Sequence, residues 1–263
     1  MLFLSNFKST VLIWFLVLAT CGNQADTSQA APKYLMDSVA RDSVKPIVVA
    51  ANRTQAYLPL LTGKTIGVVA NQTSVIFKES GTVHVVDSLL SLQLDIKKVF
   101  APEHGFRGQA DAGEHVKDGL DTQTGLPLIS LYGKNKKPSQ TQLDGLEVVL
   151  FDIQDVGVRF YTYIATLQLV MEACAEKGIP IVVLDRPNPN AHYVDGPTME
   201  TEHTSFLGMT EIPLVYGMSI GEYAQMINAE GWLENGSKAD LTVIILENWT
   251  HASVYSLPIR PSP

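Results

Sequence analysis

Short apolar segments that are hydrophobic throughout alternate with helical patterns along this chain, and this alternation restricts its fold more than any other feature. Residues 148–153 (Val-Val-Leu-Phe-Asp-Ile) form the strongest of these segments. A stretch with apolar residues at helical spacing follows at 161–176, and Gly178 then ends the helix before another apolar segment at 181–184. Strands that are buried on both faces and separated by helices are typical of parallel sheets covered on both sides. The sequence therefore predicts an α/β fold with a mostly parallel sheet.

The same patterns predict the remaining elements. Further strands are expected at residues 65–70, 96–101, 126–131 and 241–246, and further helices at 83–92 and 220–233. After the last strand the chain continues only into a loop-like segment, 257–263, rich in proline. We therefore expect the chain to be a fragment or to lack a second, C-terminal domain.

Charge argues against nucleic acid as a partner. The formal net charge is −8, and the 19 Lys and Arg residues are dispersed along the chain, whereas phosphate backbones are bound by clustered basic side chains. The one basic run, at residues 134–137, is short and is predicted to be a solvated loop.

The N-terminus is typical of an exported protein. Lys8 precedes an apolar stretch at 11–19, which is too short to cross a bilayer and fits a signal peptide. Its end, Leu18-Ala19-Thr20-Cys21, resembles a bacterial lipobox, so Cys21 is the predicted lipidation site; Thr20 departs from that pattern and leaves ordinary cleavage open. We expect a signal peptide at 1–20, a flexible tether at 21–45 and a folded domain at 46–263, in a periplasmic or outer-membrane lipoprotein.

Polar residues follow three of the predicted strands. The clusters are Glu103-His104, Asp152 with Gln154 and Asp155, and Asp185-Arg186-Pro187-Asn188. In open parallel sheets, ligands bind beyond the carboxyl ends of the strands. We therefore expect the three clusters to face one cleft.

Two carboxylates near the first cluster suit the cleavage of a glycosidic bond. That reaction needs one protonated carboxyl group to protonate the leaving oxygen, and a second, ionised group that supports the oxocarbenium-like centre or activates water. Glu103 directly follows a buried strand, where the loss of water favours a neutral carboxyl group. Glu114 lies in a more polar stretch and would stay ionised.

Two other kinds of hydrolase are open at this point. Residues 217–221 match the Gly-x-Ser-x-Gly pattern of serine hydrolases, with Asp240 and His251 following in order, but Ser219 and Glu222 also form a helix capping box, which we favour. The segment 103–115 contains metal-ligand residue types, but its spacing matches no zinc motif, so no metal is predicted.

Several motifs in order resemble one family, the NamZ-type exo-β-N-acetylmuramidases, long filed as a domain of unknown function. The resemblance begins with Ala101-Pro102-Glu103-His104-Gly105-Phe106-Arg107-Gly108 and Asp111-Ala112-Gly113-Glu114. It continues through Thr124-Gly125-Leu126-Pro127, Ser130-Leu131-Tyr132-Gly133, Phe151-Asp152-Ile153-Gln154-Asp155-Val156-Gly157, Arg159-Phe160-Tyr161-Thr162-Tyr163 and Leu184-Asp185-Arg186-Pro187-Asn188-Pro189. It covers the chain from about Gly63 to the end.

This resemblance implies a Rossmann-like domain followed by a smaller domain that helps to close the cleft. It also implies release of terminal N-acetylmuramic acid from peptidoglycan fragments in cell-wall recycling, without a cofactor. Its expected partners are muramyl sugars or muropeptides, together with the membrane through the lipid anchor. A non-catalytic cell-wall-binding lipoprotein is the alternative.

Carried onto these positions, the resemblance assigns general acid/base catalysis to Glu103. Glu114 is the expected second carboxylate, and Asp152 is its rival. The expected hydrogen-bonding residues for the sugar are His104, Gln154, Asp155, Tyr161, Tyr163, Asp185 and Asn188. Muramic acid also carries a lactyl carboxylate, which a guanidinium group can bind in a bidentate manner. The candidates for that contact are Arg107, Arg159 and Arg186, of which at least one is expected to brace a neighbouring aspartate instead.

Overall fold

The computed structural model describes residues 45–108 and 118–260, and all structural statements below concern this part of the chain. Its main strands are β1 (Thr65–Ala70), β4 (Asp95–Ala101), β5 (Gly119–Leu120), β6 (Pro127–Ser130), β7 (Val148–Asp152), β8 (Ile181–Leu184) and β9 (Leu241–Ile244). A separate hairpin consists of β2 (Val75–Lys78) and β3 (Gly81–His84). The helices are α1 (Thr54–Leu61), α2 (Val85–Ser91), α3 (Tyr163–Lys177) and α4 (Ile220–Ala229), with short 3-10 turns η1 (Ala50–Asn52), η2 (Thr201–His203) and η3 (Glu234–Gly236).

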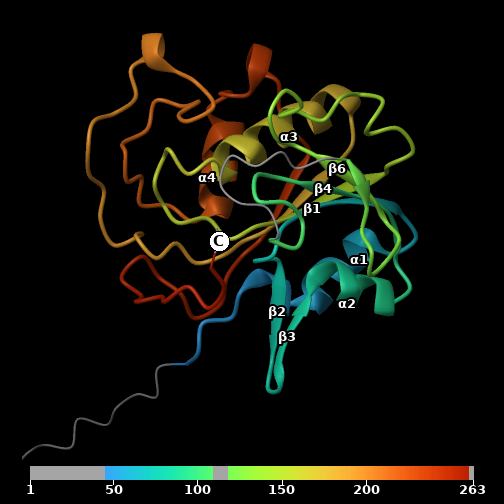
Figure 1. Cartoon of the computed structure of the whole chain (residues 1–263). Coiled ribbons are helices and arrows are strands. Elements are labelled where there is room, and N and C mark those ends of the chain that lie inside the picture. The colour runs from blue at the N-terminus through green and yellow to red at the C-terminus, as the bar shows by residue number, and fades with distance from the viewer. Residues whose placement is uncertain (1–44, 109–117, 261–263) are drawn as a thin grey trace, which may run out of the picture. The chain divides into compact units, whose positions relative to one another are not determined.

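The described strands form one seven-stranded sheet in the order β5-β6-β4-β1-β7-β8-β9 (Figure 1). Only β5, at one edge, runs antiparallel to its neighbour; every other pairing in this sheet is parallel. Counted along the chain without β5, the parallel strands lie in the order 3-2-1-4-5-6, which is that of doubly wound Rossmann folds. The predicted α/β class and parallel sheet are confirmed.

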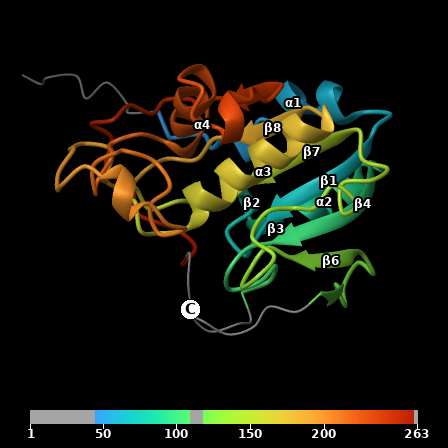
Figure 2. The same ribbon diagram turned by 90° about the horizontal axis from the view of Figure 1, so that it is seen from above.

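Helices cover both faces of the sheet because successive strand residues point to opposite sides. In β1, Val68 belongs to a core with Tyr57 of α1 and Leu89 of α2. The next residue, Val69, belongs to the other core with Leu167 of α3. Figure 1 shows α1 and α2 below the sheet and α3 and α4 above it, and Figure 2 shows the axis of α3 running roughly alongside the strands.

Local sequence accounts for most helix ends. Gly178 adopts φ 72°, a left-handed conformation that Cβ-bearing residues rarely adopt, and it ends α3 as predicted. Two predicted helices are too long. Residues 83–92 include Val83, which pairs with Ile76 in the β2–β3 hairpin, so that α2 begins at Val85. The helix predicted at residues 220–233 is also shorter in the structure, because α4 ends at Ala229, just before Gly231 at φ 71°.

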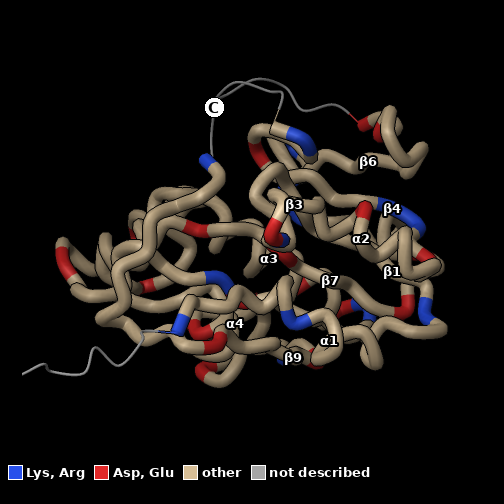
Figure 3. Tube along the Cα trace, turned by 90° about the horizontal axis from the view of Figure 1, so that it is seen from below, with Lys and Arg blue, Asp and Glu red and all other residues tan. Residues whose placement is uncertain are grey.

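The described surface carries its charges in a dispersed pattern. Figure 3 shows Lys and Arg interspersed with Asp and Glu along the chain. Within the described residues, no helix is both long and apolar enough to cross a membrane.

The strand order reverses between β1 and β7, which are neighbours in the sheet although β4 and β6 lie between them in the sequence. At such a switch point the loops that follow the two strands diverge and leave a crevice at the carboxyl edge. The polar clusters predicted after β4, β7 and β8 therefore reach this same edge of the sheet.

Candidate active site

A pocket of about 590 Å³ lies at Glu103, directly beyond the end of β4. This volume lies within the roughly 300–1,000 Å³ typical of small-molecule sites. The residues that line it are Glu103, Tyr132, Gly133, Lys136, Thr162, Ser205, Phe206 and Leu207. Among these described lining residues, Glu103 is the only one with a carboxyl group.

Two hydroxyl groups hold the Glu103 carboxylate. The Thr162 hydroxyl, just before α3, donates to Glu103 Oε2 at 3.3 Å. The Tyr132 hydroxyl lies close to the same carboxylate, and burial together with this negative charge raises the pKa of Tyr132. Glu103 itself is half-buried. A half-buried carboxyl group with fixed orientation, open to a pocket, has the geometry that proton transfer to a ligand requires.

The loop that presents Glu103 turns through two consecutive residues with left-handed backbone conformation. His104 has φ 69° and Gly105 has φ 77°, and the Gly105 amide donates to the Pro102 carbonyl at 3.0 Å. A non-glycine residue in this region is uncommon and is found most often where the surrounding structure enforces it, as at functional sites. His104 is buried beside Glu103 rather than exposed to solvent.

Arg107 anchors the same loop to the body of the domain. Its guanidinium group binds Asp87 of α2 through two nitrogens, at 2.9 and 3.0 Å, and Asp121 through two nitrogens, at 2.8 and 3.1 Å. These contacts lower the pKa of Asp121 to about 2. Because Arg107 is held by two carboxylates already, the geometry favours a bracing role over the predicted grip on a substrate carboxylate.

Asp152 and Arg186 form a buried ion pair. Arg186 donates to the two oxygens of Asp152 at 2.6 and 2.8 Å, and both side chains are at most 1% exposed. The same guanidinium group donates to the Val75 carbonyl at 3.0 Å. The pair joins β7 to β8 beneath the crevice, which favours a structural role over the expected roles of Asp152 as second carboxylate and Arg186 as carboxylate ligand.

The remaining arginine candidate braces a different loop. Arg159 donates to the main-chain carbonyls of Pro197 and Ile212, and its side chain is 8% exposed. It thereby fixes the long segment between β8 and α4, which contributes Ser205, Phe206 and Leu207 to the pocket.

Gln154 and Asn188 tie neighbouring loops together. The Gln154 amide donates to the Pro187 and Asp155 carbonyls, both at 2.7 Å, and the Asn188 amide donates to the Met218 carbonyl at 2.8 Å. Both side chains are buried. Their hydrogen bonds shape the carboxyl edge, and neither residue lines the Glu103 pocket.

Asp155 and Asp185 are buried carboxyl groups with raised pKa values. Asp155 accepts hydrogen bonds from the Gly157 amide at 2.7 Å and from the Tyr216 hydroxyl, and burial raises its pKa to about 6. Asp185 accepts the Gly221 amide at the start of α4, and burial likewise raises its pKa to about 6. Both carboxylates brace loops at this edge.

Tyr161 and Tyr163 lie at the start of α3, on either side of Thr162. Their rings meet edge to face with centroids 5.0 Å apart, and burial, Tyr161 and the Glu103 carboxylate raise the pKa of Tyr163. Tyr161 is half-buried, whereas Tyr163 is 1% exposed. The pair therefore supports Thr162, which contacts Glu103 directly.

Ser219 is not a serine nucleophile. It is fully buried, and its hydroxyl donates to Asp185 at 2.8 Å while accepting the Glu222 amide in a complete capping box. His251 is paired with Glu222 at 2.9 Å instead of activating the serine. The Gly-x-Ser-x-Gly match is therefore a helix start, and the favoured capping-box interpretation is confirmed.

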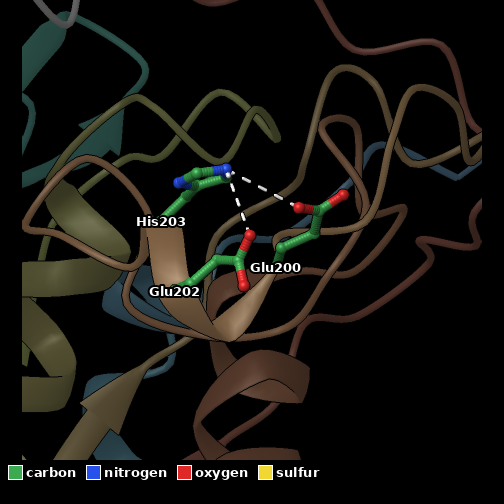
Figure 4. A group of neighbouring side chains, drawn as sticks. All are labelled: Glu200, Glu202 and His203. Carbon is green, nitrogen blue, oxygen red and sulfur yellow. Dashed lines mark ion pairs between the residues drawn. The ribbon is translucent and has the colours of Figure 1, made fainter.

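One group of potential metal ligands occurs among the described residues. Glu200, Glu202 and His203 lie together around η2 (Figure 4), and all three are exposed to solvent. The His203 ring lies 3.6 Å from Glu200 and 3.8 Å from Glu202, as expected for neighbours in one short turn. Nothing buries or orients these side chains toward an ion, and none of them lines the Glu103 pocket.

Of the eight residues that line the pocket, the sequence predicts a site role only for Glu103, and the other seven were missed. Tyr132 lies in a motif that was recognised, Ser-Leu-Tyr-Gly, but no role was given to it. Residues 134–137 form a loop, as predicted, but Lys136 and Lys137 within it are half-buried instead of fully solvated. Lys136 lines the pocket, and Lys137 bridges three glutamates. The sequence did not predict a pocket role for Phe206, because the segment around it has no periodic pattern.

Two predicted residues lie outside the described part of the chain. They are Glu114, the expected second carboxylate, and Cys21, the expected lipidation site. The predicted signal peptide and nearly all of the predicted tether also lie outside it.

Fold and pocket together define a class: a doubly wound α/β protein with a ligand pocket at the carboxyl ends of its parallel strands. The chain belongs to the family described as exo-β-N-acetylmuramidase NamZ, N-terminal, whose model matches residues 66–263. This match confirms the family that the motifs resemble.

Known proteins of this kind include one curated enzyme and two crystal structures. Over 212 residues the chain is 43% identical to the peptidoglycan β-N-acetylmuramidase NamZ of Bacillus subtilis (strain 168), covering 79% of this chain and 50% of that protein. Crystal structures of two DUF1343 family proteins from Bacteroides fragilis NCTC 9343 match with TM-scores of 0.75 and 0.72 at 42% and 34% identity. They cover 83% and 80% of this chain, and 57% and 52% of the solved chains. The chain thus spans about half the length of its relatives.

Proposed function

We propose that this chain carries the acid/base half of an exo-acting β-N-acetylmuramidase, which removes terminal N-acetylmuramic acid from peptidoglycan fragments. The observation that carries the proposal is Glu103, which lines a sugar-sized pocket and is oriented there by Thr162 and Tyr132. The relative in Bacillus subtilis is named for this activity, and it is 43% identical over the matched region.

Glu103 acts on the bond between the muramic acid and the next sugar. Its protonated carboxyl group donates the proton to the glycosidic oxygen as the bond from that oxygen to the anomeric carbon breaks. Water then adds to the anomeric carbon and transfers a proton to the Glu103 carboxylate, which restores the acid, so that the products are free N-acetylmuramic acid and a shortened fragment. The hydroxyl groups of Thr162 and Tyr132 fix the carboxyl group, and this lowers the cost of orienting it during the reaction.

A second group must stabilise the positive charge at the anomeric carbon. Glu114 remains our proposal for that role, and the acetamido group of the substrate itself is the alternative. Asp152 is the less suitable rival, because its carboxylate is fully buried and already paired with Arg186. A Glu114→Gln variant separates the possibilities: loss of activity comparable to that of Glu103→Gln favours Glu114, and near-normal activity favours the acetamido group.

The test of the function uses a 4-nitrophenyl glycoside of N-acetylmuramic acid and the full-length protein. We expect wild type to release 4-nitrophenol. Because 4-nitrophenolate departs without being protonated, the effect of Glu103→Gln is measured on the methyl glycoside of N-acetylmuramic acid, for which kcat should fall by at least about a hundredfold, the scale of general acid catalysis. The matched control is Glu79→Gln, in the exposed turn between β2 and β3, which should keep wild-type activity. A protein that binds the sugar but releases nothing is a binding protein, and that outcome contradicts the proposal.

Export and lipid anchoring are part of the same proposal. The apolar stretch at residues 11–19, the preceding Lys8 and the sequence Leu18-Ala19-Thr20-Cys21 support a signal peptide at 1–20 and acylation of Cys21, followed by a tether at 21–45. We expect the wild-type protein to be found in the bacterial membrane fraction and Cys21→Ala to leave it. Equal partitioning of the two proteins contradicts the anchor.

A further inference from the structure

Lys136 lies where two pockets meet. It lines the Glu103 pocket, and together with Ser205 and Phe206 it also lines a second pocket of about 320 Å³. Its side chain is half-buried, and its ammonium nitrogen lies 4.3 Å from the centroid of the Phe206 ring. A cation over an aromatic face is attracted by the negative charge of the π system, so this contact holds the ammonium group in place.

The ammonium group has no carboxylate partner in the described part of the chain. The adjacent Lys137 forms the contrast, because its nitrogen lies 2.6 Å from Glu176, 2.7 Å from Glu234 and 3.4 Å from Glu172. A partly desolvated positive charge attracts an anion more strongly than one in bulk water. Lys136 therefore gives the pocket a positive charge that remains available to a ligand.

The arginines near this edge do not offer such a charge. Arg107 is held by two aspartates, Arg186 by Asp152, and Arg159 by main-chain carbonyls. None of the three lines the Glu103 pocket in the described structure. By this comparison, Lys136 is the cationic side chain that shares the pocket with the carboxyl group of Glu103.

We propose that the Lys136 ammonium group binds the carboxylate of an anionic hexosamine and so makes the site prefer N-acetylmuramic acid to the neutral N-acetylglucosamine. This inference rests on the proposed glycosidase function and names the specificity residue of that same pocket. An ammonium group is a compact point charge that can bind a carboxylate without the fixed bidentate geometry of arginine. The stacked Phe206 ring limits the positions of the ammonium group and thereby the position of the bound sugar.

The experiment compares wild type with Lys136→Met, Lys136→Arg and the control Lys134→Met, an exposed lysine of the same loop. Each protein is assayed with the 4-nitrophenyl glycosides of N-acetylmuramic acid and N-acetylglucosamine. We expect Lys136→Met to lose about 10- to 100-fold in kcat/KM for the muramic acid substrate, mostly through KM, as fits loss of a charge-assisted contact. Lys136→Arg should recover part of this loss, and Lys134→Met should match wild type on both glycosides.

A binding measurement separates this inference from the function on which it rests. In the Glu103→Gln background, binding of free N-acetylmuramic acid and N-acetylglucosamine is measured by calorimetry with and without Lys136→Met. If wild type cleaves neither glycoside, the proposed function fails, and weaker muramic acid binding by Lys136→Met still supports the lysine contact. If Lys136→Met keeps the wild-type preference for muramic acid in cleavage or binding, the inference is wrong.

Discussion

Replacing Arg186 by methionine should destabilise the fold strongly. The substitution leaves the fully buried Asp152 carboxylate without the two hydrogen bonds, at 2.6 and 2.8 Å, that compensate its loss of water. Removing one partner of such a pair costs about 3–5 kcal/mol of unfolding free energy. The Val75 carbonyl also loses a donor at 3.0 Å, worth about 1 kcal/mol. We therefore expect a loss of about 4–6 kcal/mol of unfolding free energy.

The assay is urea denaturation followed by far-ultraviolet circular dichroism. A double variant, Asp152→Leu with Arg186→Met, removes both charges and should recover at least about 2 kcal/mol relative to Arg186→Met alone, because no charge remains buried and unpaired. Arg53→Met is the surface control, since Arg53 pairs with Glu247 at 2.7 Å while the two side chains are 25% and 50% exposed. That pair should be worth at most about 1 kcal/mol.

Two results would refute this reasoning. If Arg186→Met costs no more than Arg53→Met, the ion pair does not support the carboxyl edge of the sheet. If the double variant loses as much as Arg186→Met and the single variant Asp152→Leu added together, Asp152 and Arg186 act independently and each contributes through some other contact.

Three further predictions concern the same edge. The pKa of Asp155 is raised from 3.8 to about 6, so the folded protein keeps this proton to higher pH than the unfolded chain, and the unfolding free energy falls by about 3 kcal/mol as the pH rises from about 4 through 6. Asp185 contributes a similar fall in unfolding free energy. Asp155→Asn should therefore remove about half of the total fall that urea titrations measure across this pH range. An unchanged pH dependence would contradict the raised pKa of Asp155. Ser219→Ala should lower the unfolding free energy by about 1 kcal/mol or more, because the helix cap is lost, while each folded molecule keeps its activity. Complete inactivation of the folded protein would instead support Ser219 as the nucleophile. Tyr132→Phe removes the hydroxyl group that lies beside the Glu103 carboxyl group, so kcat should fall about tenfold with little change in KM, and an unchanged kcat argues against Tyr132 as a positioning residue.

The fold could be predicted from the sequence because burial on both faces leaves a clear pattern. Residues 148–153 are apolar almost throughout, and β7 occupies Val148–Asp152 at the centre of the sheet with every residue buried. Gly178 and Ser219 marked helix ends for local reasons that need no tertiary information. The β2–β3 hairpin was missed because β3 is largely exposed, so that no continuous apolar pattern marks it.

The site was predictable only in part. Glu103 could be placed at the end of a strand, but the partners of Arg107 could not be read from the sequence. Asp87 and Asp121 lie 20 and 14 residues away from it, and the fold alone brings them together. Lys136 and Lys137 illustrate the same limit: two adjacent lysines look alike in sequence, and only their three-dimensional neighbours make one a pocket residue and the other the centre of an ion-pair network.

The most direct test of the central claim is a product analysis with defined disaccharides. The full-length protein is incubated with two of them: one with N-acetylmuramic acid at the non-reducing end, and one with N-acetylglucosamine there. Mass spectrometry then identifies the free sugars. We predict release of N-acetylmuramic acid from the first disaccharide alone, and no release by Glu103→Gln. If wild type releases no muramic acid, or if Glu103→Gln releases it at the wild-type rate, Glu103 is not the acid of a muramidase.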